Sequence, residues 1–255
     1  MSAVACPYAP VLAYPSAGLL LRYDPWYATV VLVTFASAKG GVGKTSLVIH
    51  CAAAWSRRHR LLLVDADHQQ QAAAAWGRTI TGFEIASAPS RRVDAFLEQQ
   101  AGLYDCVLID TGAGLAGPVV EALRVSDVLI VPTEPTPLAA RAVLWTLNLA
   151  KELRGEQLDG LTVRLVLSRM RMNTLLARDA RAALRSYGVP IARAEIAERT
   201  VIATAAGFGR VVYDMEPSSL ATAELLALSR ELGREVFRYG HDSHEDAANE
   251  RGSAG

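Results

Sequence analysis

The sequence alternates short apolar segments with longer segments of helical character, and this alternation restricts the possible folds more than any other feature. Most of the apolar segments are rich in valine, isoleucine and leucine, which is typical of strands buried on both faces of a sheet. Strands that alternate with helices form parallel βαβ units. The sequence therefore predicts a doubly wound α/β domain, whose mostly parallel sheet carries helices on both faces.

The expected elements cover most of the chain. Strands are expected at 29–35, 60–67, 83–89, 104–110, 127–135, 161–169 and, briefly, 189–191. Helices are expected at 44–57, 68–76, 137–154, 174–187 and 218–237. Together they form one domain at 29–238. We expect a flexible arm at 1–28, which holds four prolines, and a disordered polar tail at 239–255.

Composition excludes several classes of protein. With 255 residues, 51% of them hydrophobic and 20% charged, the chain can bury a sizeable core and is not a disordered protein. No apolar run approaches the ~20 residues of a membrane span. No basic stretch precedes the short apolar run at 18–21, as a signal peptide requires. Three cysteines without metal or disulfide spacing fit a reducing cytoplasm.

Lysine is scarce in this chain. Of the 26 basic residues only Lys39, Lys44 and Lys151 are lysines, and the first two lie in one glycine-rich stretch. A coding bias towards arginine explains the scarcity. It also makes the remaining lysines informative, because they can mark places where a compact ammonium group cannot be replaced by a planar guanidinium group.

The glycine-rich stretch lies between the strand expected at 29–35 and the helix that begins near Lys44. Such a turn binds phosphate, because its backbone N–H groups point inward and the helix N-terminus adds positive potential. Lys44 would contact the β- and γ-phosphates of a nucleotide, and the Thr45 hydroxyl would bind Mg²⁺. Ala38 replaces the first glycine of G-x-x-x-x-G-K-[ST], and the pattern that matches instead is K-G-G-x-G-K-[ST].

The stretch from Lys39 to Thr45 resembles the deviant Walker A motif of the ParA/MinD family of P-loop ATPases, and the similarity extends from about Val31 to Phe237. In that family the first lysine, here Lys39, reaches across an ATP-bound homodimer to the partner's phosphates. Ser168 stands where the family often has an adenine-contacting asparagine, and Pro217 lies in a matching loop near the adenine. The nucleotide-binding residues implied are Lys39, Gly40, Gly41, Val42, Gly43, Lys44, Thr45, Ser46, Ser168 and Pro217.

Three aspartates complete the expected site, because carboxylates at the C-terminal ends of parallel strands point into the ligand crevice. Asp65 and Asp67 resemble the family's D-x-D-P-Q motif, with His68 in place of proline. The resemblance implies that Asp67 orients the attacking water, as one of three catalytic residues with Lys39 and Lys44. It also implies that Asp65 and Asp110 join Thr45 around Mg²⁺. Gly112 replaces another common proline in the loop after Asp110.

The resemblance implies a slow, Mg²⁺-dependent ATPase of the small ParA type. Its ATP-bound dimers would bind DNA without sequence preference and position a plasmid, a chromosome or a protein cargo. A ParB-type adaptor, or its equivalent for another cargo, would stimulate hydrolysis. We expect the protein to be cytoplasmic and associated with the nucleoid. Because the formal net charge is zero, contact with DNA needs a local basic patch. The candidate DNA-binding residues are Arg178, Arg181, Arg185, Arg199 and Arg210.

Two other functions remain open at this point. One is a MinD-like ATPase on a membrane, for which the leucines of the helix at 218–237 would have to face lipid. Because such a stripe more often packs into a core, we do not expect a membrane partner. The other is a nucleotide-binding module with little hydrolysis, if His68 and Gly112 disturb the loops that carry the catalytic groups.

Overall fold

A computed structural model describes residues 30–89, 91–100, 102–115, 117–170 and 175–252 of the chain. The described strands form a six-stranded sheet in the order β3-β2-β4-β1-β5-β6, with every pairing parallel. They are β1 (Val31–Ser37), β2 (Leu61–Asp65), β3 (Glu84–Ser87), β4 (Cys106–Ala113), β5 (Val128–Thr133) and β6 (Thr162–Leu167).

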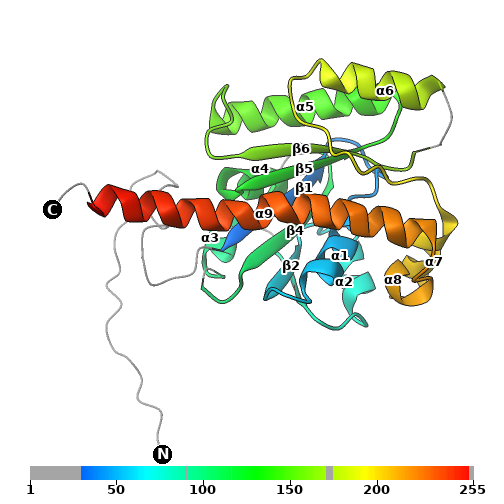
Figure 1. Cartoon of the computed structure of the whole chain (residues 1–255), viewed down its shortest axis with the longest axis horizontal. Helices are drawn as coiled ribbons and strands as arrows, with labels where there is room; N and C mark the ends of the chain where they lie inside the picture. Colours follow the sequence, from blue (N-terminus) through cyan, green and yellow to red (C-terminus); the bar gives the residue numbers. More distant parts are fainter. Residues whose placement is uncertain (1–29, 90, 101, 116, 171–174, 253–255) are drawn as a thin grey trace, which may run out of the picture.

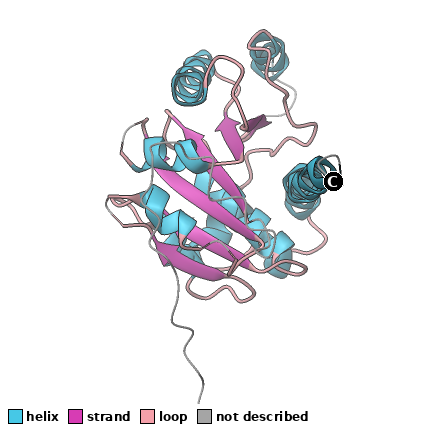
Figure 2. Cartoon of the chain, turned by 90° about the vertical axis from the view of Figure 1, so that its left-hand side faces the viewer, coloured by secondary structure: helices cyan, strands magenta, loops and turns pink. Residues whose placement is uncertain are grey.

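Helices connect the strands and cover both faces of the sheet (Figures 1 and 2). They are α1 (Lys44–Trp55), α2 (Ala72–Gly77), α3 (Val93–Glu98), α4 (Pro118–Val125), α5 (Pro137–Arg154), α6 (Leu175–Arg185), α7 (Thr200–Gly207), α8 (Val212–Met215) and α9 (Leu220–Gly252). The doubly wound α/β fold predicted from the sequence is confirmed. The arm predicted at 1–28 lies outside the described residues.

The central strand β1 shows how the two layers form. Its Val33 and Phe35 side chains belong to a core shared with α1 and α9, whereas Leu32 and Ala36 belong to cores on the opposite face, which include side chains of α3, α4 and α5. Every residue of β1 is buried. This explains why the strand is mostly apolar and lacks the regular alternation of apolar and polar residues that a strand with one exposed face would show.

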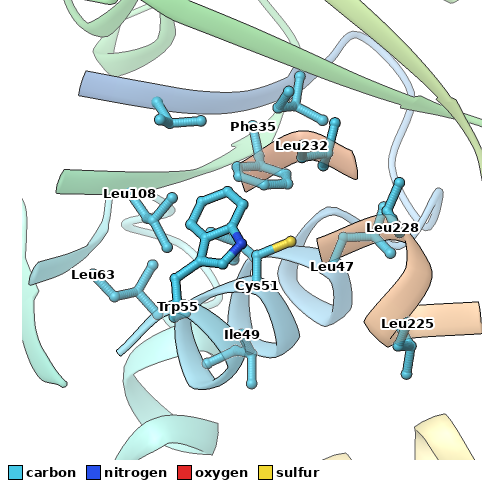
Figure 3. Close-up of a cluster of buried hydrophobic side chains, with 14 of the residues drawn as sticks. Phe35, Leu47, Ile49, Cys51, Trp55, Leu63, Leu108, Leu225, Leu228 and Leu232 are labelled. Atoms are coloured by element: carbon cyan, nitrogen blue, oxygen red, sulfur yellow. The ribbon is translucent and has the colours of Figure 1, made fainter. Parts of the chain in front are cut away.

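The largest core lies between the sheet and the helices α1 and α9 (Figure 3). The Trp55 ring fills this space, and its Nε1–H donates a hydrogen bond to the carbonyl oxygen of Ser229 in α9, at 2.8 Å. The leucine stripe of α9 is buried in the same core at Leu225, Leu228 and Leu232. Leu220, at the start of α9, is 68% exposed, so the expectation that this stripe packs into the core is confirmed for its other leucines and not for Leu220.

Several elements differ from the sequence-based prediction. Four helices of eight residues or fewer, α3, α4, α7 and α8, were not predicted, because such short helices show little periodicity of their own. The strand expected at 189–191 is only a single bridge between Leu165 and Ile191. Pro190, which has no N–H group to donate, limits further pairing there.

The last helix is longer than predicted. We expected it to end at Phe237 and to be followed by a disordered tail, but α9 continues to Gly252. The physical reason is that residues 238–252 contain no proline and include good helix formers such as Ala247 and Ala248. The division of the chain into an arm, a domain and a tail remains a prediction.

Gly233 lies in α9 where the Trp55 ring approaches the helix. A Cβ atom at this position would come within 2.9 Å of Trp55 Nε1. We therefore expect Gly233→Ala to lower the free energy of unfolding by about 1–3 kcal/mol, although a glycine-to-alanine change within a helix usually stabilises it. Chemical denaturation measures the change. Gly207→Ala is the matched control, because a Cβ atom there meets nothing within 4 Å; equal effects of the two substitutions would contradict the packing argument.

A buried histidine makes folding sensitive to acid. The Nδ1 of His50 lies 2.6 Å from the carbonyl oxygen of Ser46, and its Nε2 accepts a hydrogen bond from the N–H of Val212. Nδ1 therefore carries the proton of a neutral ring. Burial lowers the pKa of His50 from 6.5 to about 4, against the opposing effect of the Ser46 carbonyl. The unfolded chain binds a proton below about pH 6.5, where folded His50 stays neutral, so stability falls as the pH falls through this interval.

We expect this histidine alone to cost roughly 3 kcal/mol of unfolding free energy between about pH 7.5 and about pH 4. The quantity to measure is the difference in stability between the wild type and His50→Phe. The raised pKa of Asp110 makes the unfolding free energy change with pH in the opposite sense. This effect is the same in the wild type and in His50→Phe, so it cancels in the difference. The advantage of the wild type should shrink as the pH falls, and a difference that is constant with pH would refute the assignment.

A candidate nucleotide-binding site

The predicted site residues converge at the C-terminal edge of the sheet. Asp65 and Asp110 are register partners on β2 and β4, and Phe35 of β1 is the register partner of Asp110 on its other side. The central strand β1 lies between β4 and β5, so the chain leaves this region towards both edges of the sheet. Such a switch point is where doubly wound sheets bind ligands.

The loop after β1 is shaped by glycine. Gly41 and Gly43 have φ angles of 76° and 92°, in the left-handed region that favours glycine. A Cβ atom at Gly43 would also lie 2.8 Å from the hydroxyl of Ser168. The close approach of β6 to the loop therefore requires a glycine here, and α1 begins at the next residue.

The two lysines of the loop occupy different environments. Lys44 is buried, and burial lowers its pKa while Asp110 and Asp67 oppose that effect. Its ammonium lies 3.5 Å from the carbonyl oxygen of Lys39. The Lys39 side chain is 24% exposed and pairs with Glu134 at 2.6 Å. One lysine thus lies within the loop and the other on its outer rim.

Thr45 and Asp110 fit a magnesium site. The Thr45 hydroxyl donates a hydrogen bond to Oδ2 of Asp110 at 2.7 Å, and the buried Oδ1 of Asp110 has no hydrogen-bond partner. Burial, together with the charges of Asp65 and Asp67, raises the pKa of Asp110 to about 7, against the opposing effects of Thr45 and Lys44. Within the described ranges no three or more His, Cys, Asp or Glu side chains cluster as metal ligands. Mg²⁺ would therefore depend on Thr45, Asp110, water and nucleotide phosphates.

The other two aspartates organise the loop after β2. Asp65 accepts hydrogen bonds from the backbone N–H groups of Asp67 and Ala74, at 3.0 and 2.8 Å. Both carboxylate oxygens of Asp65 therefore have protein partners. Its predicted place in the metal site stays a prediction. Asp67 accepts N–H groups from residues 69 and 70, and its carboxylate lies 3.1–3.2 Å from where a Cβ of Gly112 would be. Glycine at 112 thus allows the close contact of the two loops.

A pocket of about 440 Å³ lies beside the glycine loop. One wall contains Gly41, Gly43 and Ser168, and the other is formed by the segment before α7 and by α7 itself. This is the expected location for the nucleoside part of a nucleotide. Ser168 is buried against the loop, and its predicted contact with the adenine stays a prediction. Pro217 is exposed and is not among the residues that line this pocket, so its predicted contact would need another arrangement of its loop.

Three charged residues of the site were missed. Arg169 donates a hydrogen bond to the carbonyl oxygen of Gly41 at 2.8 Å and pairs with Glu198 at 3.0 Å and with Glu134 at 3.7 Å. Arg169 also has a φ of 53°, which is uncommon for a residue other than glycine. A signal for Glu134 was present, because it is an acid directly after a buried strand, like Asp110 after the apolar run of β4.

The arginines predicted to bind DNA do not form one free surface. Arg181 pairs with Glu195 at 2.6 Å, and Arg199 pairs with Glu224 at 2.5 Å. Arg185 is exposed, and Arg210 donates to a backbone carbonyl in α8. Arg178 belongs to α6, but its side chain lies outside the described part of the structure.

A strand–loop–helix with two lysines, a threonine and a strand-terminal aspartate, on a parallel sheet of this order, defines a P-loop ATPase of the ParA/MinD type. Comparison with known proteins agrees. A family model described as VirC1 protein matches residues 30–231. The chain belongs to this VirC1 family. In the described residues no helix combines the length and the apolar character needed to span a membrane.

Two curated relatives and one solved structure illustrate the similarity. The chain is 34% identical over 170 residues to the maintenance of carboxysome distribution protein A of Gloeobacter kilaueensis, covering 64% of this chain and 74% of the relative. It is 28% identical over 233 residues to the chromosome-partitioning ATPase Soj of Thermus thermophilus, covering 75% and 91%. The septum site-determining protein MinD of Pyrococcus horikoshii, solved with Mg-ADP, has a TM-score of 0.66 at 19% identity, covering 80% and 96%.

Lys44→Ala should weaken Mg-ATP binding by about a hundredfold or more, because it removes the buried cation of the loop. Isothermal titration calorimetry measures the loss. Lys151→Ala is the matched control, since Lys151 forms a surface pair with Glu156 on the far end of α5. Nucleotide binding by Lys44→Ala at the wild-type level would show that the loop is not the phosphate site.

Proposed function

We propose that this protein is a ParA-type ATPase that dimerises when ATP is bound, and whose dimers bind DNA without sequence preference to position a cargo. The observation that carries the proposal is the unequal placement of the two loop lysines. Lys44 is buried beside Asp110 and Asp67, where it can serve its own nucleotide. Lys39 lies on the rim of the loop, where a second subunit could approach. A cation in that position can link nucleotide binding to dimerisation.

ATP would bind with its phosphates at the residues 39–46 and its nucleoside in the pocket beside Ser168. Mg²⁺, when bound near Thr45 and Asp110, would neutralise charge on the phosphates. Asp67 is the candidate to orient the attacking water, and Gly112 allows its carboxylate to lie close to the loop after β4. Hydrolysis would mainly require positioning, which fits a slow ATPase that needs a stimulating partner.

A basic groove beside α9 fits DNA better than the arginines in α6 and directly before α7 that are paired with glutamates. A groove of about 740 Å³ separates α9 from the segment after β6, and five arginines line it. Arg164 is paired there with Glu235, and Glu231 accepts N–H groups of residues 193 and 194. Arg193, Arg230, Arg234 and Arg238 are exposed. Phosphate contacts need charge rather than a sequence code, so this groove is the proposed DNA surface.

The cargo is proposed from the relatives. One maintains the distribution of carboxysomes and another partitions chromosomes, so both a protein assembly and a DNA molecule are candidate cargoes. An adaptor of the ParB type, or its equivalent for a protein cargo, would stimulate hydrolysis. A protein with this role would be cytoplasmic and associated with the nucleoid.

The alternative of a MinD-like membrane protein has less support. Four residues of the α9 stripe are buried against α1 and the sheet, namely Leu225, Leu228, Leu232 and Val236, whereas Leu220 is exposed. A nucleotide-binding module with little hydrolysis remains the other alternative. Phosphate release by the purified protein, with Mg²⁺ and an adaptor encoded beside its gene, distinguishes that alternative from an ATPase.

We expect binding to random-sequence DNA to require ATP and to depend on the groove. Arg230→Gln with Arg234→Gln should lower the DNA affinity about tenfold and reduce the slope of affinity against salt concentration by about two. Fluorescence anisotropy across a salt series, with ATP, ADP or no nucleotide, gives both quantities. Lys39→Ala should abolish the ATP dependence, because its dimer would not form.

The matched control is Arg78→Gln with Arg124→Gln, which removes the same charge from exposed positions outside the groove. This variant should bind DNA as the wild type does, and the two double variants are first shown to dimerise with ATP. Equal losses in the two double variants would show that net charge, and not this groove, determines DNA binding. Absence of DNA binding in every nucleotide state would reject the DNA-carrier function.

A further inference from the structure

Glu134 forms a charged contact that the proposed ATPase cycle does not yet explain. Its carboxylate oxygen Oε2 lies 2.6 Å from Nζ of Lys39, and both side chains are largely shielded from solvent, at 16% and 24% exposed. The backbone around Glu134 is fixed by the turn into α5, because its carbonyl oxygen accepts the N–H of Thr136, the residue that caps the helix. The turn thus places Glu134 beside the loop that carries Lys39.

A second cation lies beside the same carboxylate. Nη1 of Arg169 is 3.7 Å from Oε1, the other carboxylate oxygen of Glu134, and it also donates to the carbonyl oxygen of Gly41. Its Nη2 pairs with Glu198 in the wall of the neighbouring pocket. Arg169 can therefore neutralise Glu134 after Lys39 has left. A carboxylate left without a counter-charge would make the release of Lys39 costly, and Arg169 removes this cost.

We propose that Glu134 is a positioning residue that holds Lys39 in its own subunit until nucleotide and a partner subunit draw it away. This inference rests on the proposed function, in which Lys39 acts on the phosphates of a partner. One ammonium cannot lie 2.6 Å from Glu134 and at the same time reach across a dimer interface. The two positions of Lys39 exclude each other, so the pair with Glu134 favours the monomer.

The size of the effect follows from the population of the released state. If Lys39 is free of Glu134 only part of the time, the ATP concentration needed for dimerisation rises by the inverse of that fraction. For a partly exposed ion pair of this kind, we expect the ATP concentration needed for dimerisation to change by about fivefold when the pair is removed. Glu134→Gln keeps the shape of the side chain and removes its charge. It should therefore promote dimerisation, whereas loss of a merely structural contact would leave it unchanged or weaken it.

The scarcity of lysine makes a direct test possible without nucleotide. Lys39, Lys44 and Lys151 are the only lysines, so acetylation by an N-hydroxysuccinimide ester can be followed at each one by mass spectrometry. Lys39 should be acetylated about fivefold faster in Glu134→Gln than in the wild type. Lys44 and Lys151 should keep their rates, which also shows that the variant is folded. An unchanged rate at Lys39 would overturn the proposal.

The matched control is Glu156→Gln, which removes the partner of Lys151 and should leave Lys39 unaffected. The second measurement is dimerisation against the concentration of a non-hydrolysable ATP analogue with Mg²⁺, followed by analytical ultracentrifugation. The half-maximal concentration should fall about fivefold in Glu134→Gln and not in Glu156→Gln. An equal or higher concentration for Glu134→Gln would overturn the holding role. Dimerisation of Lys39→Ala at wild-type concentrations would instead reject the proposed function, independently of the acetylation rates.

Discussion

The candidate site depends on one buried carboxylate, that of Asp110. The parallel sheet places it in the buried part of β4, where its desolvation is unfavourable unless cations or donors approach it. Thr45 and Lys44, at the start of α1, are the groups that do so. The glycines before them allow the chain to turn tightly enough to bring the helix N-terminus there. The loop, the start of the helix and the positive charge of Lys44 thus all meet at a single acid.

The fold could be predicted from the sequence because parallel strands buried on both faces leave a clear signal. The strands β1, β4 and β5 are mostly apolar, and each was placed within a few residues of its actual bounds. The short helices were missed because packing against the sheet, and not their own periodicity, stabilises them. The extension of α9 beyond Phe237 was not predicted because the segment that follows is polar and carries no apolar stripe, although it contains no proline.

The site was predictable to the extent that its residues lie in one continuous motif or at strand ends. Residues 39–46 and Asp110 could be named from local pattern alone, and the structure brings them together. Arg169 and Glu198 could not, because their relevance depends on how the segment after β6 folds back over the loop. The DNA candidates show the same limit. Helical spacing indicates which arginines share a face, but not which of them have a glutamate such as Glu195 or Glu224 as a neighbour.

The helix α9 has one face in the core and another lining the arginine groove. Its apolar side packs on Trp55, while Glu231 and Glu235 tie it to the opposite wall of the groove through residues 193, 194 and 164. A polyanion that bridges Arg193 and the arginines of α9 would hold the same two walls together. Binding at this surface is therefore thermodynamically linked to folding, and the chain would resist local opening of α9 more strongly when the groove is filled than when it is empty.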